Sequence, residues 1–132
     1  MCTEDILKPH RANYRVLLVD DNTSFLDMAR DFLSEEPDLT VVGTLSSPLD
    51  VFDHIQSAAP NVAILDLSMP DTNGLELTRM LRQRHPMLRI IVLTLLNTPH
   101  HRKAALDAGA DAFVVKSSMD DELIPAIRRL KL

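Results

Sequence analysis

The sequence predicts an α/β domain in which helices cover both faces of a central parallel β-sheet, and three observations favour this fold class. Five short runs rich in Val and Ile alternate with stretches in which apolar residues recur at helical spacing. The runs are nearly continuous in apolar residues, which is typical of strands buried on both faces. The length of 132 residues, with 45% hydrophobic and 25% charged, suits one globular domain rather than two.

The first two strand–helix units follow from this pattern. Residues 15–19 (RVLLV) form the first predicted strand, and the helix after it has an apolar face made of Phe25, Leu26, Ala29, Phe32 and Leu33. Residues 39–44 (LTVVGT) form the second strand. The next helix begins at Ser47-Pro48, because a capping Ser followed by Pro is a common helix start, and it ends before Pro60.

The third and fourth units repeat the order. Residues 61–65 (NVAIL) form the third strand, and the helix after it ends before Pro86. Residues 89–93 (RIIVL) form the fourth strand. Thr98-Pro99 then offers a cap followed by Pro, which predicts the start of the fourth helix.

The fifth unit completes the domain. Residues 111–115 (DAFVV) form the last strand, and Ser118 with Asp121 three positions later resembles a capping box. The last helix is lined by Leu123, Ile124, Ile127 and Leu130. Because strand–helix–strand crossovers are right-handed, five such units place helices on both faces of one parallel sheet.

Polar residues follow four of the five predicted strands. Asp20-Asp21 ends the first strand, Asp66 the third, Thr94 the fourth and Lys116 the fifth. Ligands bind at the carboxyl ends of the strands in open parallel sheets, so these side chains are expected to meet at one edge.

This set of side chains indicates a phosphoryl-transfer site. Three neighbouring carboxylates repel each other by several kcal/mol at an effective dielectric constant of about 20, which a purely structural core would avoid. A hard divalent cation removes that repulsion, and Mg²⁺ takes carboxylates, waters and phosphate oxygens as ligands. A lysine and a hydroxyl nearby can hold the phosphoryl oxygens, and one carboxylate can act as the nucleophile.

With these residues in place, residues 14–131 resemble the receiver domain of bacterial response regulators, the phospho-acceptor part of two-component signalling. The ending KSSMDDELIPAIRRL is most similar to receivers of the NarL/FixJ subgroup. The resemblance implies a flavodoxin-like sheet with the strand order 2-1-3-4-5. The segments that carry it are VLLVDD ending at Asp21, ILDLSMPDTNG from Ile64 to Gly74, VLT ending at Thr94, and GADAFVVK from Gly109 to Lys116.

The resemblance also implies a role for each site residue. Asp66 is expected to be phosphorylated, by the phosphohistidine of a sensor histidine kinase or phosphotransfer protein or by a small acyl phosphate. Asp21 is expected to bind Mg²⁺ directly, Asp20 largely through water, and Ser68 through its backbone carbonyl. Lys116 is expected to pair with the phosphoryl group. The domain then catalyses its own aspartyl phosphorylation and dephosphorylation, without being an enzyme in the usual sense.

Two further positions relate to switching, and one departs from the family pattern. Thr94 is expected to move to the phosphoryl group, and Phe113 occupies the aromatic switch position. Together they are expected to reshape the face made by the fourth helix, fifth strand and fifth helix. Leu95 stands where family members usually carry a small residue, so it is expected to act as a lid that slows phosphorylation, hydrolysis or both.

Three other functions have to be weighed against a phospho-acceptor. A pseudo-receiver would keep the fold without phosphorylation and act as a protein-binding module. An aspartate-dependent phosphatase is disfavoured, because Ser68 stands where that class carries a second Asp. A nucleotide or flavin binder is disfavoured, because no Gly-rich loop follows the first strand and the chain has only 3 glycines.

Composition limits the surroundings of the domain. Residues 1–13 are expected to form a tail without a secretory signal, and residues 14–132 the receiver, so the expected location is the cytoplasm. No apolar run spans a membrane, and the net charge of −5 disfavours direct nucleic-acid binding. No output domain is expected within the chain, and the NarL-type ending favours a fragment of a transcription regulator, whose output domain or a partner would use the switching face.

Overall fold

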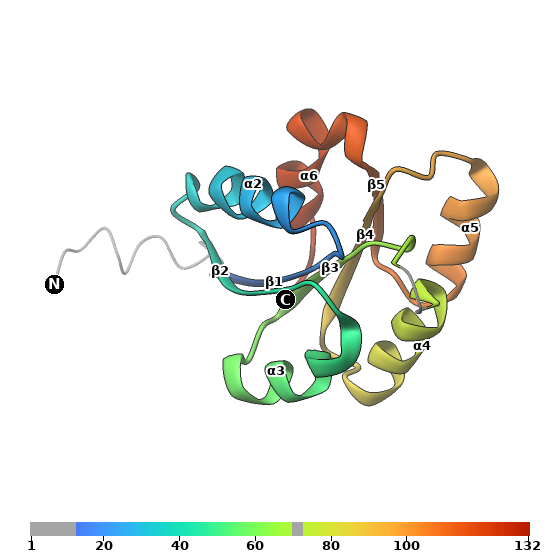
Figure 1. Ribbon diagram of the computed structural model, residues 1–132, viewed down its shortest axis with the longest axis horizontal. Helices are drawn as coiled ribbons and strands as arrows, with labels where there is room; N and C mark the ends of the chain where they lie inside the picture. Colours follow the sequence, from blue (N-terminus) through green and yellow to red (C-terminus); the bar gives the residue numbers. More distant parts are fainter. Residues whose placement is uncertain (1–12, 70–72) are drawn as a thin grey trace, which may run out of the picture.

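A five-stranded parallel sheet forms the centre of the molecule (Figure 1). The computed structural model describes residues 13–69 and 73–132, so most of the predicted tail, residues 1–12, lies outside the described residues. The strand order β2-β1-β3-β4-β5 confirms the predicted topology. All strands begin and end within one residue of the predicted bounds: β1 Tyr14–Val19, β2 Leu39–Leu45, β3 Val62–Leu65, β4 Arg89–Thr94 and β5 Ala112–Val115.

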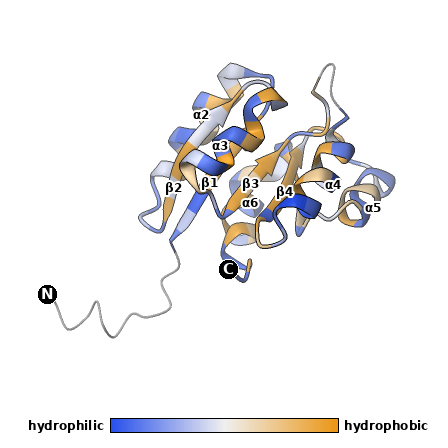
Figure 2. Cartoon of the chain, turned by 90° about the horizontal axis from the view of Figure 1, so that it is seen from below, coloured by the Kyte–Doolittle hydropathy of each residue, from blue (hydrophilic) through white to orange (hydrophobic). Residues whose placement is uncertain are grey.

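Helices cover both faces of the sheet. α2 (Thr23–Ser34) and α6 (Met119–Arg128) share one hydrophobic core with the sheet face toward them. On the other face lie α3 (Val51–Ala58), α4 (Gly74–Arg84) and α5 (Pro99–Asp107), with a second core. Figure 2 shows the apolar strands between helices whose outer sides are hydrophilic. Within the described residues, no helix is both long enough and apolar enough to cross a bilayer.

The helix starts agree only partly with the sequence pattern. The Thr98 hydroxyl accepts a hydrogen bond from the His101 N–H, and Pro99 is the first residue of α5, as predicted. The capping box at Ser118 and Asp121 is wrong. Ser118 has φ −112° and ψ 11° because it ends a short 3₁₀ turn, Lys116–Ser118, and its side chain caps nothing. A capping side chain needs an extended backbone at that residue.

The edge strand β2 contains a bulge. Val16 pairs with Val41, but Leu17 pairs with Gly43, so Val42 has no partner in β1. The imidazole of His54 in α3 packs on this bulge, with its Nε2 3.3 Å from the Val42 carbonyl oxygen. A Cβ on Gly43 would lie 2.0 Å from the same nitrogen, so only glycine leaves room for the ring.

A charged cluster ties the amino ends of β4 and β5 to α4. The Arg82 guanidinium donates to the carbonyl oxygens of Leu88 and Gly109, at 2.7 and 2.8 Å, and to the Asp111 carboxylate at 2.6 Å. Asp111 also accepts from the Ile90 N–H at 2.8 Å. We call Arg82 and Asp111 the amino-end clamp.

Candidate functional site

The predicted site residues lie at the carboxyl ends of the strands. Asp20 follows β1, Asp66 follows β3, Thr94 is the last residue of β4, and Lys116 follows β5. The Asp66 N–H donates to the Val19 carbonyl at 3.2 Å, which extends the pairing of β3 with β1 into the site. Adjacent parallel strands thus deliver the side chains to one edge of the sheet, as predicted.

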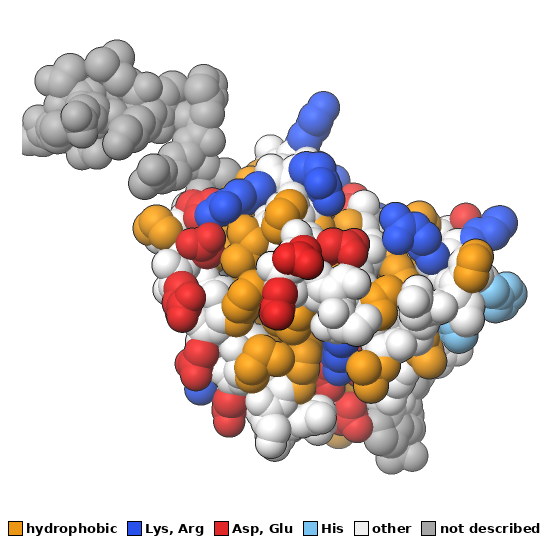
Figure 3. Space-filling view, turned by 90° about the horizontal axis from the view of Figure 1, so that it is seen from above, with side chains coloured by type: hydrophobic (Ala, Val, Ile, Leu, Met, Phe, Trp, Pro, Cys, Tyr) orange, Lys and Arg blue, Asp and Glu red, His pale blue; other side chains and the backbone are white. Residues whose placement is uncertain are grey.

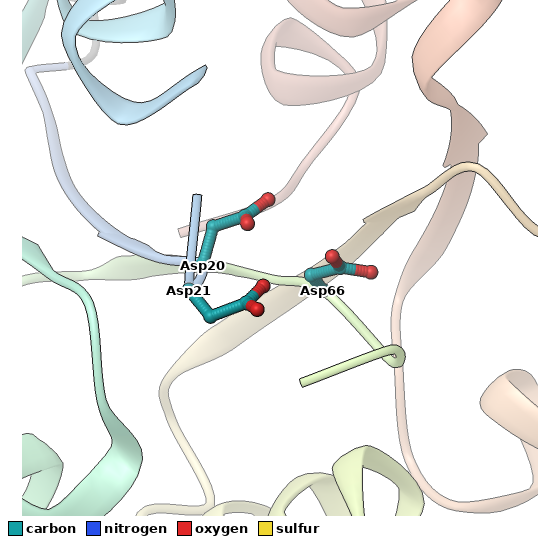
Figure 4. Close-up of side chains that lie close together, drawn as sticks. All are labelled: Asp20, Asp21 and Asp66. Carbon is teal, nitrogen blue, oxygen red and sulfur yellow. The ribbon is translucent and has the colours of Figure 1, made fainter. Parts of the chain in front are cut away.

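Three carboxylates form the centre of the site, and we call Asp20, Asp21 and Asp66 the acidic cluster. Figure 4 shows two of them coming from the end of β1 and one from the end of β3. One oxygen from each lies within 4.8 Å of the others. Asp20 and Asp66 are buried, with 3% and 5% of their surfaces exposed, whereas Asp21 is exposed. Asp21 is therefore the member that solvent reaches most easily.

Lys116 joins two of these carboxylates. Its Nζ donates to Asp20 Oδ2 at 2.5 Å and to Asp66 Oδ2 at 3.3 Å. The same ammonium lies 4.0 Å from the centroid of the Phe25 ring. One ammonium against three carboxylates leaves the site with an excess of negative charge.

Backbone contacts fix the two buried carboxylates. The Asn22 N–H donates to Asp20 Oδ1 at 2.9 Å, and the Ser68 N–H donates to Asp66 Oδ1 at 3.1 Å. Gly74, the first residue of α4, lies against the chain just after Asp66, where a Cβ would be 2.6 Å from the Leu67 Cα. Both carboxylates are therefore oriented before any ligand arrives.

Electrostatics show why this cluster suits a cation. Burial raises the pKa of Asp20 above its ordinary value, because desolvation outweighs the opposing effect of the Lys116 hydrogen bond. Two like charges 4.8 Å apart repel by about 3.5 kcal/mol at an effective dielectric constant of about 20. The donors are all hard oxygens, which Mg²⁺ prefers. The acidic cluster is thus compatible with a Mg²⁺ site.

The other predicted residues lie beside the acidic cluster. Thr94 is buried, and its hydroxyl oxygen accepts from the Leu96 N–H at 3.2 Å. Phe113 is buried in the core beneath α5, with the Arg102 guanidinium 5.8 Å above its ring. Leu95 is 72% exposed, and with Lys116 it lines a surface pocket of about 350 Å³. Of the site residues, this pocket contains Lys116 but none of the three carboxylates, so whether Leu95 acts as a lid stays a prediction.

Sequence reasoning missed two contributors to the site. Phe25 was predicted only as part of an apolar helix face, but its ring contacts Lys116. Asn22 caps α2 by accepting from the Phe25 N–H at 3.0 Å and also holds Asp20. Asn at a helix start is a recognisable capping signal, whereas nothing in the sequence indicates which ring a distant lysine will meet.

Comparison with known proteins shows the family of this chain. A family model described as the response regulator receiver domain matches residues 16–128. The DNA-binding transcriptional activator DevR/DosR of Mycobacterium tuberculosis is 38% identical over 114 residues, which cover 86% of this chain and 52% of the relative. The nitrate/nitrite response regulator protein NarL of Escherichia coli is 32% identical over 114 residues, which cover 86% of this chain and 53% of the length of NarL. The chain thus spans about half the length of these curated relatives.

Solved structures give the same result. A two-component response regulator of the LuxR family from Aurantimonas sp. SI85-9A1 superposes with a TM-score of 0.82 at 29% identity, covering 88% of this chain and 83% of that one. The isolated REC domain of RcsB from Salmonella enterica serovar Typhimurium was solved in the presence of the phosphomimetic BeF₃⁻. It superposes with a TM-score of 0.79 at 28% identity, covering 91% of this chain and 92% of that one. With its strand order and its acidic cluster, this chain belongs to the response regulator receiver domain family.

Proposed function

We propose that this chain is a phospho-acceptor switch in which Asp66 takes a phosphoryl group from the phosphohistidine of a sensor kinase or phosphotransfer protein, or from a small acyl phosphate. The observation that carries the proposal is the acidic cluster with Lys116 bridging Asp20 and Asp66. Carboxylates held this close together destabilise the folded domain when no ligand is bound. We therefore interpret the cluster as the binding site of a ligand that offsets their repulsion.

The reaction follows from the positions of these side chains. A carboxylate oxygen of Asp66 attacks phosphorus, the bond from phosphorus to the donor nitrogen or oxygen breaks, and an acyl phosphate remains on Asp66. The Ser68 N–H, which holds Asp66 Oδ1, leaves the other oxygen for the attack. Lys116, already 3.3 Å from that second oxygen, offers its donors to the incoming phosphoryl oxygens. Water later hydrolyses the acyl phosphate and resets the switch.

The proposed metal ligands are Asp21 directly, Asp20 largely through water, Asp66, and the backbone carbonyl of Ser68. When bound there, Mg²⁺ supplies positive charge that offsets the carboxylates and the phosphoryl oxygens. The exposure of Asp21 and the burial of Asp20 support this division of roles, because a solvated cation reaches the exposed oxygen first.

The proposed output is a change in the face made by α5, β5 and α6. Thr94 gives up its contact with the Leu96 N–H and donates its hydroxyl to a phosphoryl oxygen. That movement leaves space toward Phe113, whose ring shifts relative to Arg102 at the surface of this face. Phosphorylation thus biases a two-state equilibrium between two arrangements of one surface.

The setting we propose is the cytoplasm, with residues 14–132 as the regulatory part of a NarL-type transcription regulator. DevR/DosR supports this, because it is a DNA-binding transcriptional activator and the match covers about half of the length of DevR/DosR. In this proposal the domain itself contacts a kinase and an output domain or partner protein, and neither nucleic acid nor membrane.

The experiment is intact-mass spectrometry after incubation with acetyl phosphate and Mg²⁺. One added phosphoryl group is expected in the wild type, and none in Asp66→Asn or without Mg²⁺. Asp27→Asn is the matched control, because Asp27 is an exposed carboxylate on α2, paired with Arg30 outside the site, and this variant should be phosphorylated normally. Phosphorylation that survives Asp66→Asn would refute the proposal.

The exposed Leu95 favours one alternative, a pseudo-receiver that binds proteins without being phosphorylated. Leu95 lines the same surface pocket as Lys116, and in this alternative the leucine blocks access of a phosphodonor to the site. Beryllofluoride separates the two functions, because it mimics the phosphoryl group without a phosphodonor. Absence of both phosphorylation and any spectral response to beryllofluoride would refute the phospho-acceptor proposal and favour the alternative.

A further inference from the structure

A closed ring of contacts joins Phe25 to the site. The Asn22 N–H donates to Asp20, and the Asn22 side chain accepts from the Phe25 N–H. The Phe25 ring in turn faces the Lys116 ammonium at 4.0 Å, and that ammonium returns to Asp20 at 2.5 Å. The aromatic ring is thus placed by the helix cap that also orients a site carboxylate.

Phe25 lines two separate spaces, one internal and one at the surface. Beneath it lies a cavity of about 10 Å³ lined by Asp20, Asp66 and apolar residues, with room for one water molecule at most. Outside it lies the surface pocket of about 350 Å³ that Met28 and Leu95 help to line. Figure 3, viewed from the side of α2 and α6, shows apolar side chains exposed among acidic ones on this face. Phe25 therefore borders both the small cavity beside the two buried carboxylates and the surface pocket that Lys116 helps to line.

This position matters because a lysine side chain is flexible. Its four-carbon stem has many rotamers, and its ammonium is strongly hydrated. Without the ring, the ammonium can turn outward into the surface pocket. A ring face attracts the cation yet accepts no conventional hydrogen bond, so the N–H donors stay available on the opposite side. The Lys116 side chain is 10% exposed, which agrees with such a restraint.

We propose that Phe25 is a positioning residue for phosphoryl transfer, whose ring holds the Lys116 ammonium toward Asp66. This inference rests on the proposed function, since it concerns the same reaction. Phe25 touches neither the phosphoryl group nor the attacking oxygen, and it acts through Lys116.

The test compares three variants of the full chain. Phe25→Leu removes the ring, Phe25→Tyr keeps it, and Phe32→Leu removes a ring from the same helix, likewise partly buried against the same core. With acetyl phosphate and Mg²⁺, the phosphorylation rate should fall about tenfold in Phe25→Leu, as expected for loss of a shielded cation–π contact. It should recover in Phe25→Tyr and stay at the wild-type level in Phe32→Leu. Urea unfolding should show similar stability losses for both leucine variants.

A second readout reports the contact without any reaction. The ring current of Phe25 should shift the NMR signals of the Lys116 ε-methylene upfield, with the assignment made from their disappearance in Lys116→Gln. The shift should vanish in Phe25→Leu and persist in Phe25→Tyr and Phe32→Leu.

The outcomes are separable. Equal phosphorylation rates for wild type and Phe25→Leu, or equal losses in Phe25→Leu and Phe32→Leu, would overturn this inference and leave the proposed function intact. An unshifted methylene signal in the wild type would also overturn it. A wild type that takes no phosphoryl group from acetyl phosphate would refute both proposals together.

Discussion

The two ends of the sheet differ in how far their charged side chains are paired with opposite charges. At the amino end, the Arg82 guanidinium is met by the Asp111 carboxylate and by carbonyl oxygens, and Asp111 also accepts from backbone. At the carboxyl end, three carboxylates face a single lysine, and the pKa of Asp20 is raised by its burial. Among the described residues, the carboxylate at the amino end is paired with two arginines, whereas the carboxyl end leaves negative charge uncompensated.

We infer from this difference that the amino end of the sheet contributes to stability, whereas the carboxyl end serves ligand binding. A cluster whose charges and hydrogen bonds are satisfied stabilises the fold as it stands. A cluster with excess charge of one sign costs stability until a ligand of opposite charge arrives, which is how binding energy becomes coupled to the site. Substitutions at the two ends should therefore change the free energy of unfolding in opposite directions.

Arg82→Ala should have the largest effect. It leaves the Leu88 and Gly109 carbonyls without their charged donor, and it leaves the Asp111 carboxylate with only the Arg89 guanidinium, 3.8 Å away, so we expect a loss of about 3 kcal/mol in the free energy of unfolding. Urea denaturation followed by circular dichroism measures it. Arg79→Ala on the same helix is the control, because that exposed pair with Glu76 should contribute less than about 0.5 kcal/mol. Equal losses in the two variants would show that the amino-end clamp stabilises the fold no more than an exposed ion pair does.

Mg²⁺ should stabilise the wild type next most strongly. A concentration about ten times the dissociation constant adds about 1.4 kcal/mol when only the folded state binds. Thermal unfolding with and without Mg²⁺ shows this as a rise in midpoint. Asp66→Asn should reduce the rise, whereas Asp111→Asn should leave it unchanged although it lowers the midpoint itself. A rise of the same size in both variants would mean that Mg²⁺ binds elsewhere.

Asp20→Asn should stabilise the protein in the absence of Mg²⁺, by less than Arg82→Ala destabilises it. Because the folded state raises the pKa of Asp20, its protonated form is favoured at low pH, and that contribution is lost as pH rises through the raised pKa. The advantage of Asp20→Asn over wild type should therefore grow with pH across that interval. Urea midpoints of both proteins measured from acidic to neutral pH provide the test, and an advantage that shrinks with rising pH would contradict it.

Leu95→Ala should change stability least, by less than about 0.5 kcal/mol, because the side chain is 72% exposed. Its effect should appear in kinetics instead. If leucine covers the mouth of the site, phosphorylation by acetyl phosphate, hydrolysis of the phosphorylated form, or both should accelerate. Rates followed by intact mass measure this, with Met28→Ala as the control, because Met28 is another exposed apolar residue that lines the same pocket. Unchanged rates in Leu95→Ala would remove the lid from the proposal.

Local sequence signals predicted the fold well. Residues 89–93, nearly all apolar, became β4, and Thr98-Pro99 became the start of α5, because both depend on neighbours along the chain. The failure at Ser118 also has a local cause, since the 3₁₀ turn before α6 gives that residue a compact backbone that its sequence does not reveal. Strand ends could be predicted because periodicity stops there.

The site could be predicted only in part. Asp20, Asp21, Asp66 and Lys116 were found because topology brings strand ends together whatever their details. The contact of the Phe25 ring with Lys116 depends on side-chain directions between elements far apart in sequence, and so does the amino-end clamp at the other end of the sheet. Nothing in a single sequence specifies such pairs, so they had to come from three-dimensional structure.

The bulge in β2 has a consequence for how the protein behaves at high concentration. An exposed sheet edge invites another copy to add a strand, which begins aggregation. At Val42 the ladder is interrupted, the carbonyl faces the His54 ring, and a bulge increases local twist. This edge is therefore a poor template for an added strand. Gly43→Ala, which displaces His54, should make concentrated samples prone to aggregate.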